Sequence, residues 1–233
     1  MDNNFVEISK NLLLAVKEKS DFFSFMATLE QVSLWELTEN LNSDEKKKAF
    51  WLNVYNAYVQ IILQADKSLY NNRDLFYTRK RVIIASVRLS LDDIEHGILR
   101  RSKAKISFGY LNKPNVSHAE RQLRVSRVDP RIHFALNCGA LASPYIHIFD
   151  EESFNKQIND ATRQYLETKV SFKDGENSLC IPKFFKWFLA DFRGSKGVKS
   201  FLKKYGYQDA VKQENLQITF MPFEWDLSLN RFK

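Results

Sequence analysis

A long helix that is apolar around most of its circumference is the feature that most constrains this fold. Ser43 is a suitable N-cap, and residues 44–65 (DEKKKAFWLNVYNAYVQIILQA) follow it with acidic side chains in the first turn. Apolar residues form two neighbouring rows along this helix: Phe50, Val54, Ala57 and Ile61, and then Trp51, Tyr55, Tyr58 and Ile62. Because a helix with so wide an apolar surface must be covered by other elements, we expect it to be central in its domain.

Three amide side chains interrupt the apolar surface of this helix. Asn53, Asn56 and Gln60 follow one another at spacings of three and four, so they form a single polar ridge. Buried amides need hydrogen-bond partners. The ridge is therefore either an internal hydrogen-bond spine or one wall of a pocket.

The remaining segments predict an α+β fold, a mostly helical single domain around a small, largely antiparallel β-sheet. Seven Gly and five Pro are few for 233 residues, which disfavours an all-β sandwich with many tight turns. We expect residues 1–45 to be a helical extension packed on the core and residues 46–233 to form the domain. Periodicity predicts helices at 5–19, 22–32, 150–169 and 198–205, and a short helix that Ser90 or Asp92 caps and that stops near Ser102. Other segments predict a strand or a hairpin arm at 79–89, a strand at 131–138, a strand leading into a helix at 178–192, and a strand with a polar tail at 216–230.

Charge and cysteine content narrow the class of protein. The net charge is +7, and residues 103–129 form a basic stretch without strong periodicity, which we expect to be irregular. No recognised nucleic-acid-binding motif accompanies these charges, so we interpret them as a solvated surface and do not expect nucleic acid as a partner. Cys138 and Cys180 are too few for a disulfide framework. With neither a signal peptide nor a membrane span visible, we expect a cytoplasmic protein.

The stretch from Asp129 to Pro144 (DPRIHFALNCGALASP) contains several residue types that often act in catalysis or binding, namely a histidine, an asparagine and a cysteine. One parity is shared by Ile132, Phe134, Leu136 and Cys138, and the other by Arg131, His133, Ala135 and Asn137. This alternation predicts a strand with an apolar and a polar face, ended by the small residues from Gly139 onward.

Four blocks resemble a known family when they are taken in order. FWLNVYNAYV, LDDIEHGILR, DPRIHFALNCGA and FEWDLSLN together resemble the domain of unknown function 547 family, from about Phe50 to Asn230. The family name implies no established activity. What the resemblance implies is a set of shared positions: Asn53, Asn56, Glu95, His96, His133 and Cys138. The chain departs from the pattern at Ser143, where members commonly carry a second cysteine, and this weakens a disulfide or a two-thiolate metal site.

Our leading functional hypothesis is a thiol-dependent hydrolase or acyl transferase. Cys138 would attack a carbonyl, and His96 would activate the thiol. Asn53 or Asn137 would orient the histidine or donate to the oxyanion. On one strand His133 points away from Cys138, so it would instead meet Glu95 or His96 and the Asn53 ridge on the polar side of the pocket.

The alternative hypothesis is a non-enzymatic module that binds a small molecule or a protein. In that case the His, Asn and Cys cluster is structural, and Cys138 is a core cysteine. No paired His or Cys spacing supports a metal site, and we expect no cofactor. The partner is a small molecule or peptide that the sequence does not identify, and the sequence does not set the oligomeric state.

Overall fold

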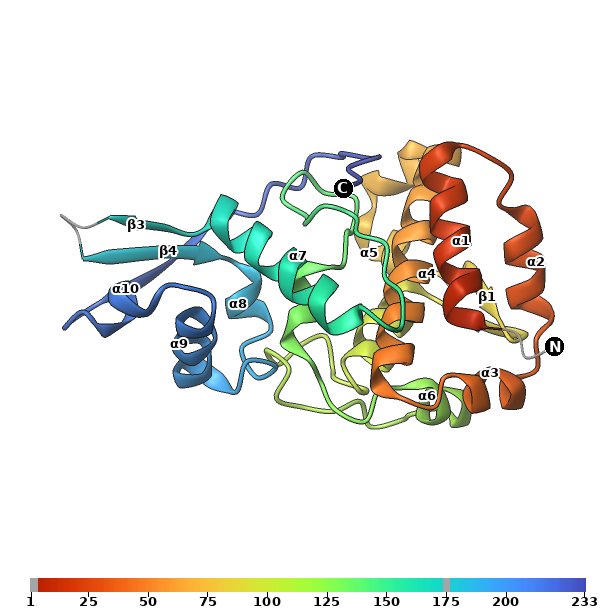
Figure 1. Ribbon diagram of the computed structural model, residues 1–233, viewed down its shortest axis with the longest axis horizontal. Helices are drawn as coiled ribbons and strands as arrows, with labels where there is room; N and C mark the ends of the chain where they lie inside the picture. The colour runs from red at the N-terminus through yellow and green to blue at the C-terminus, as the bar shows by residue number, and fades with distance from the viewer. Residues whose placement is uncertain (1–3, 174–176) are drawn as a thin grey trace.

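The computed structural model describes residues 4–173 and 177–233, and helices dominate it. Helix α4 (Asp44–Ala65) runs through the centre of the larger part of the molecule, where α1 (Phe5–Glu18) packs along it and α2 (Phe23–Gln31) lies outside α1 (Figure 1). Ser43 caps α4 as expected, accepting a hydrogen bond from the Lys46 amide at 3.2 Å. The burial of α4 and its packing against α1 confirm that this helix is central in its domain.

The other helices and strands are mostly short and surround α4. They are α3 (Leu34–Asn40), a 3-10 helix (Lys67–Asn71), α5 (Arg73–Thr78), β1 (Val82–Ile84), β2 (Val87–Leu89), a π-helix (Asp93–Leu99), α6 (His118–Leu123) and a second 3-10 helix (Pro130–Phe134). The rest are α7 (Phe154–Lys169), β3 (Ser171–Lys173), β4 (Ser178–Pro182), α8 (Phe184–Trp187), α9 (Gly194–Lys204), α10 (Gln208–Lys212) and β5 (Gln217–Met221).

The strands form two small sheets at the periphery. β1 and β2 are an antiparallel hairpin, whereas β4 pairs antiparallel with β3 and parallel with β5. The three-stranded sheet, α9 and α10 lie at the opposite end of the molecule from α1 and α2, and α7 lies between the two ends (Figure 1). The mostly helical α+β class is therefore confirmed, with the strands divided between two sheets.

Two hydrophobic clusters fill the interior. The first surrounds α4 and includes Phe5, Leu12 and Leu13 of α1, so residues before 46 share the core of the domain. The second is rich in aromatic residues and joins α7, β4, α8 and α9. The 3-10 helix Pro130–Phe134 connects them, because Ile132 belongs to the first cluster and Phe134 to the second.

Two expectations about local structure are wrong. The strand expected at 131–138 is the 3-10 helix Pro130–Phe134 followed by irregular chain. Pro130 stands in its first turn, and the Asp129 carboxylate accepts from the Arg131 amide at 3.0 Å, a local arrangement that favours a helical start. The stretch 103–129 is also not wholly irregular, since α6 lies within it with Ser117 as its N-cap.

Candidate functional site

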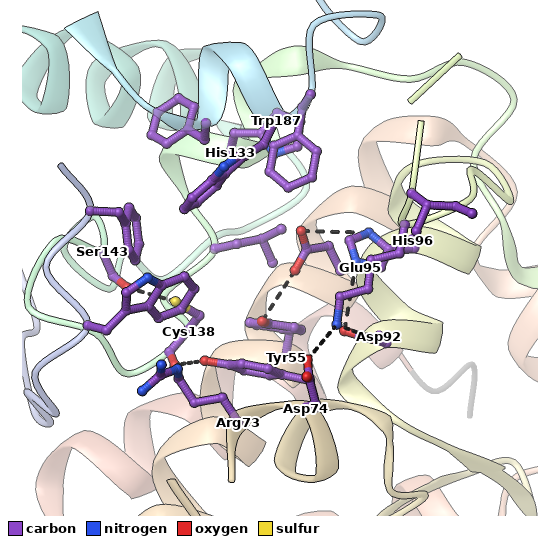
Figure 2. A pocket seen from close by; sticks show the side chains of 18 of the residues that line it. Tyr55, Arg73, Asp74, Asp92, Glu95, His96, His133, Cys138, Ser143 and Trp187 are labelled. Carbon is purple, nitrogen blue, oxygen red and sulfur yellow. Dashed lines mark hydrogen bonds and ion pairs between the residues drawn. The ribbon is translucent and has the colours of Figure 1, made fainter. Parts of the chain in front are cut away.

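A cavity of about 860 Å³ opens where residues of all four sequence blocks meet. Its lining comes from α4, α5, the π-helix, residues 105–108, the chain around Cys138, α8 and residues 223–225. In Figure 2, Cys138 and Ser143 lie together on one side, whereas Asp92, Glu95 and His96 lie on the other. Of the residues expected at the site, Glu95, His96, His133 and Cys138 line this cavity.

The π-helix Asp93–Leu99 presents the acidic side of the cavity. Its wide turns are closed by bonds such as that from the Arg100 amide to the Glu95 carbonyl, 2.9 Å long. π-Helical turns are rare and are frequent at functional sites. The Glu95 carboxylate accepts a hydrogen bond of 3.4 Å from the Tyr55 hydroxyl of α4. Lys105 closes this side by pairing with Asp92 at 3.0 Å and with Asp74 at 3.7 Å.

Burial changes the protonation of Glu95. Removal from water, together with the nearby charge of Asp92, raises its pKa to about 7, although Arg100 and Lys105 act in the opposite direction. A carboxyl group with a pKa near neutrality can both accept and donate a proton there. Glu95 is therefore the titratable group of the cavity best suited to proton exchange.

The hydrogen-bond partners of His96 fix its tautomer. Arg100 Nη1 lies 2.9 Å from His96 Nδ1, and a guanidinium can only donate, so Nδ1 accepts. The neutral ring consequently carries its hydrogen on Nε2, which lies 3.7 Å from an Asp92 carboxylate oxygen. Burial and the positive charge of Arg100 hold the pKa of His96 well below its usual range.

His133 is held by the carboxylate of Asp191, which lies outside the four blocks, between the third and the fourth. Its Nε2 lies 2.9 Å from Asp191, whose carboxylate also pairs with Arg100 at 2.6 Å. Hydrogen bonds from His133 and Arg100 outweigh burial and lower the pKa of Asp191 to about 2. The His133 ring stacks on Phe188 at 4.1 Å, and burial lowers the pKa of the imidazole.

Cys138 is half-buried at the cavity wall beside Ser143. The two side chains approach to 3.2 Å, and the Tyr77 hydroxyl donates to the Cys138 carbonyl at 2.7 Å. Burial raises the pKa of the thiol, although hydrogen bonds from Ser143 and the Ala140 amide act against it. Among the residues that the structure describes, no imidazole is hydrogen-bonded to the sulfur. The expected pairing with His96 stays a prediction.

The amide ridge of α4 is a hydrogen-bond spine. Asn53 exchanges hydrogen bonds with the Phe149 backbone, accepting at 2.9 Å and donating at 2.8 Å. Asn56 accepts from the Asn137 amide at 2.9 Å and donates to the Ala135 carbonyl at 3.0 Å. The Asn137 side chain donates to the Pro144 carbonyl. The amides of Asn53 and Asn137 are thus engaged by backbone, and neither residue lines the cavity.

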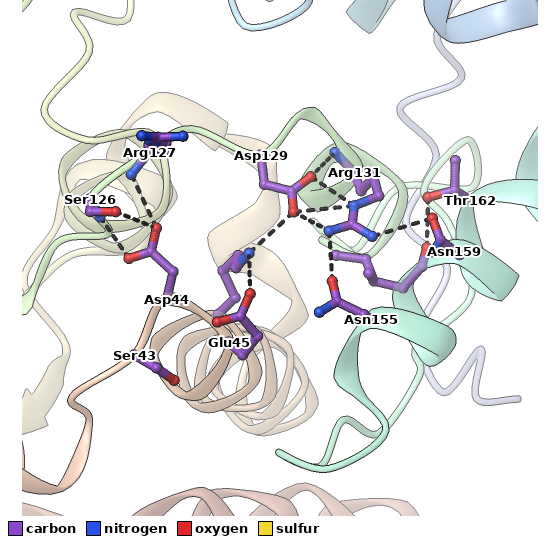
Figure 3. Close-up of polar contacts among 12 residues, drawn as sticks. Ser43, Asp44, Glu45, Ser126, Arg127, Asp129, Arg131, Asn155, Asn159 and Thr162 are labelled. Carbon is purple, nitrogen blue, oxygen red and sulfur yellow. Dashed lines mark hydrogen bonds and ion pairs between the residues drawn. The ribbon is translucent and has the colours of Figure 1, made fainter. Parts of the chain in front are cut away.

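A second polar cluster fixes the beginning of the Asp129–Pro144 stretch (Figure 3). The Asp129 carboxylate pairs with the guanidinium of Arg131 and with Lys48 of α4, the latter at 3.2 Å. Arg131 in turn donates to Asn155 and Asn159 of α7 at 3.0 and 3.2 Å. The stretch is therefore tied to α4 and α7 before it reaches the cavity.

Aromatic side chains form the wall of the cavity that the sequence did not reveal. Trp187, Phe223 and Trp225 contact one another with ring centroids 4.5–5.9 Å apart, and the Arg73 guanidinium lies over Trp225 at 5.0 Å. The cluster FFKWF around Trp187 reads equally well as core, and Tyr55 stands in an apolar row of α4. For Trp225 the sequence did offer an indication of a place at the site, because this residue belongs to the block FEWDLSLN.

Neither a metal site nor a membrane span is found in the described residues. Within 4–173 and 177–233, no three His, Cys, Asp or Glu side chains are grouped to hold a metal ion. In the same part of the chain, no helix combines the length and the apolar character needed to cross a bilayer.

Comparisons with known proteins identify the family and nothing closer. No curated protein matches the chain, and no solved structure does so either. The family model described as "Protein of unknown function, DUF547" matches residues 38–166, more than half of the chain, and contains three of the four blocks; FEWDLSLN lies beyond it. The chain therefore belongs to the DUF547 family.

Proposed function

We propose that this domain binds a small organic molecule in the cavity, with an apolar ring against the aromatic wall and a polar end at Glu95. The observation that carries the proposal is the composition of the 860 Å³ cavity, which has aromatic side chains on one wall and buried titratable groups on another. Concave, largely apolar cavities with a few converging polar groups are the usual form of small-molecule sites.

Glu95 supplies the polar recognition in this proposal. With a pKa of about 7, its carboxyl group accepts a hydrogen bond from the ligand when ionised and donates one when protonated. Tyr55 holds one carboxylate oxygen at 3.4 Å, which orients the group toward the cavity. A ligand that develops or loses charge at this end would exchange its proton with Glu95.

Simple aromatic probes test this binding. Benzylamine, with its hydrogen-bond-donating ammonium, is expected to raise the thermal unfolding midpoint and to change tryptophan fluorescence more than benzoate does. Glu95→Gln should reduce the preference for the amine, and Trp187→Leu should weaken both probes. Trp35→Leu is the matched control, because that side chain is 72% exposed on α3. Equal responses of the Trp187 variant and the parent protein would rule out the aromatic wall as the binding surface.

A second candidate function is thiol-dependent hydrolysis or acyl transfer, favoured by the place of Cys138 on the wall of the same cavity. Its sulfur would attack a substrate carbonyl after losing its proton to His96. The leaving group would depart with that proton, and water or an acceptor would then cleave the resulting thioester. The raised pKa of Cys138 and the hydrogen carried on His96 Nε2 both act against that proton transfer, which is why binding is our first proposal.

Thiol labelling separates the two candidates. In a Cys180→Ser background, the thiol mechanism requires iodoacetamide to label native Cys138 quickly near neutral pH, and His96→Ala must slow that labelling. Labelling that occurs only after denaturation would leave Cys138 as a structural residue. Cys180 has to be removed first because it too is only partly buried.

A further inference from the structure

The loop formed by residues 101–113 exposes an unusual amount of apolar surface. Ile106, Phe108, Tyr110 and Leu111 lie within six positions, and their exposed fractions are 80, 51, 58 and 61%. Single exposed apolar side chains are common on proteins, but several in one place mark an interaction surface. We name residues 101–113 the basic apolar loop.

The basic apolar loop is held in place by the interior. Gly109 has a φ of +85°, and a Cβ there would come within 2.7 Å of Arg100 Nη2 and 2.8 Å of an Asp191 carboxylate oxygen. The Phe108 carbonyl accepts from the Ala190 amide at 3.0 Å, and the Ala104 amide donates to the Leu111 carbonyl at 2.9 Å. The apolar side chains are thus presented by an anchored turn.

The charge of the loop has one sign. Arg101, Lys103, Lys105 and Lys113 belong to it, and the sequence has no Asp or Glu between Glu95 and Glu120. Lys105 and Lys113 pair with carboxylates of the π-helix region and α6. The other two cations carry no ion pair within the described residues, and Arg101 is exposed. Positive charge thus borders exposed apolar side chains.

We propose that the basic apolar loop docks this protein on an anionic membrane surface. Exposed apolar side chains insert at the boundary between headgroups and acyl chains, and flanking cations bind anionic lipid headgroups. Phosphate contacts in a nucleic acid would use the cations but would leave four exposed apolar side chains unexplained. Ile106 and Phe108 also line the cavity, so its mouth faces the membrane in the docked state.

Cosedimentation of the full chain with lipid vesicles tests this docking. We expect pelleting with vesicles of equal phosphatidylcholine and phosphatidylserine, little pelleting with phosphatidylcholine alone, and loss of binding as salt is raised. Arg101→Gln with Lys103→Gln should weaken binding about fivefold for each charge removed. Ile106→Ser with Leu111→Ser should weaken it roughly tenfold without changing charge.

Matched variants elsewhere on the surface serve as controls. Lys203→Gln with Lys204→Gln removes two charges from α9, and Phe23→Ser with Trp35→Ser removes two exposed apolar side chains. Both controls should pellet like the parent protein. Equal effects of loop and control variants, equal binding to neutral vesicles, or no binding at all would each overturn the proposal. It would also fail if the loop changes abolished self-association in sedimentation velocity instead, because the surface would then join two copies of the chain. Thermal unfolding midpoints confirm that each variant is folded.

Discussion

The surroundings of Glu95 bring the pKa of its carboxyl group close to neutral pH. On another side of the same π-helix, Gly97 lies so close to Glu120 that a Cβ at this position would come within 2.8 Å of the Glu120 side chain. Burial raises the pKa of Glu95 from an ordinary value of 4.5 to about 7. Such a carboxyl group responds to small changes around it, including a ligand in the cavity.

Replacement of Glu95 by Gln tests this pKa through stability. Below the unfolded-state pKa both states of the parent protein are protonated, and no penalty exists. As pH rises toward 7, Glu95 ionises first in the unfolded state. The free energy of unfolding of the parent protein therefore falls by up to roughly 3 kcal/mol, and that of the Gln variant does not. Urea unfolding near pH 5 and near pH 8 should show the stability of Glu95→Gln relative to the parent increasing with pH. Asp74→Asn is the control, because the Asp74 side chain is 95% exposed.

At the scale of elements, helix α4 organises the chain around the cavity through its three amides. Asn53 fixes the chain at Phe149, Asn56 fixes it at Ala135 and Asn137, and Gln60 accepts from the Asn230 amide at 2.8 Å. These bonds replace the strand ladder that the alternation of residues 131–138 suggested. One helix thereby positions three segments that are distant in sequence.

Asn56→Ala should destabilise the protein by about 2–4 kcal/mol. The Asn137 amide and the Ala135 carbonyl would both lose their partner while buried, and each unsatisfied group costs about 1–3 kcal/mol. Urea unfolding measures the change. Gln64→Ala, which removes an exposed amide of the same helix, should leave stability nearly unchanged. A small loss at Asn56 would show that water or a relaxed backbone satisfies the freed groups.

Sequence periodicity predicted the long helices, but it failed where local hydrogen bonds determine the backbone conformation. α4, α1 and α7 are clear because their apolar residues recur with the helical period. The stretch after Asp129 was misleading because residues 132–137 are all buried, so the alternation of apolar and polar residues carried no information about their faces. Glu95, His96, His133 and Cys138 could be assigned to one cavity from family blocks, whereas Asp191 could not, since only the fold brings it to His133.

At the scale of the whole molecule, the ion pair of Arg100 with Asp191 connects its two parts. Both side chains are completely buried, and their bonds of 2.6 and 3.2 Å join the end of the π-helix to the chain after α8. Arg100 also lies over the Phe188 ring at 4.3 Å. The pair thus stands at the junction of the α4-centred cluster and the aromatic cluster.

Asp191→Ala should cost about 3–5 kcal/mol, because it leaves the Arg100 charge buried without a counter-ion. The double change Arg100→Met with Asp191→Leu should recover most of that loss, since two apolar side chains then fill the site. Chemical denaturation of the single and double variants measures both effects. If the double variant is no more stable than Asp191→Ala alone, the cost arises from lost shape and not from the unpaired charge.

The tail from Glu224 to Lys233 closes the turn that follows Cys138. Amides of Leu141, Ala142 and Ile146 donate to carbonyls of this tail, and the Ser228 amide donates back to the Gly139 carbonyl at 2.7 Å. These partners lie more than eighty positions apart in the sequence, so the hydrogen bonds between them are long-range contacts. During synthesis on the ribosome, these hydrogen bonds cannot form until about eighty further residues have been added, and the same holds for the cavity wall that Phe223 and Trp225 supply.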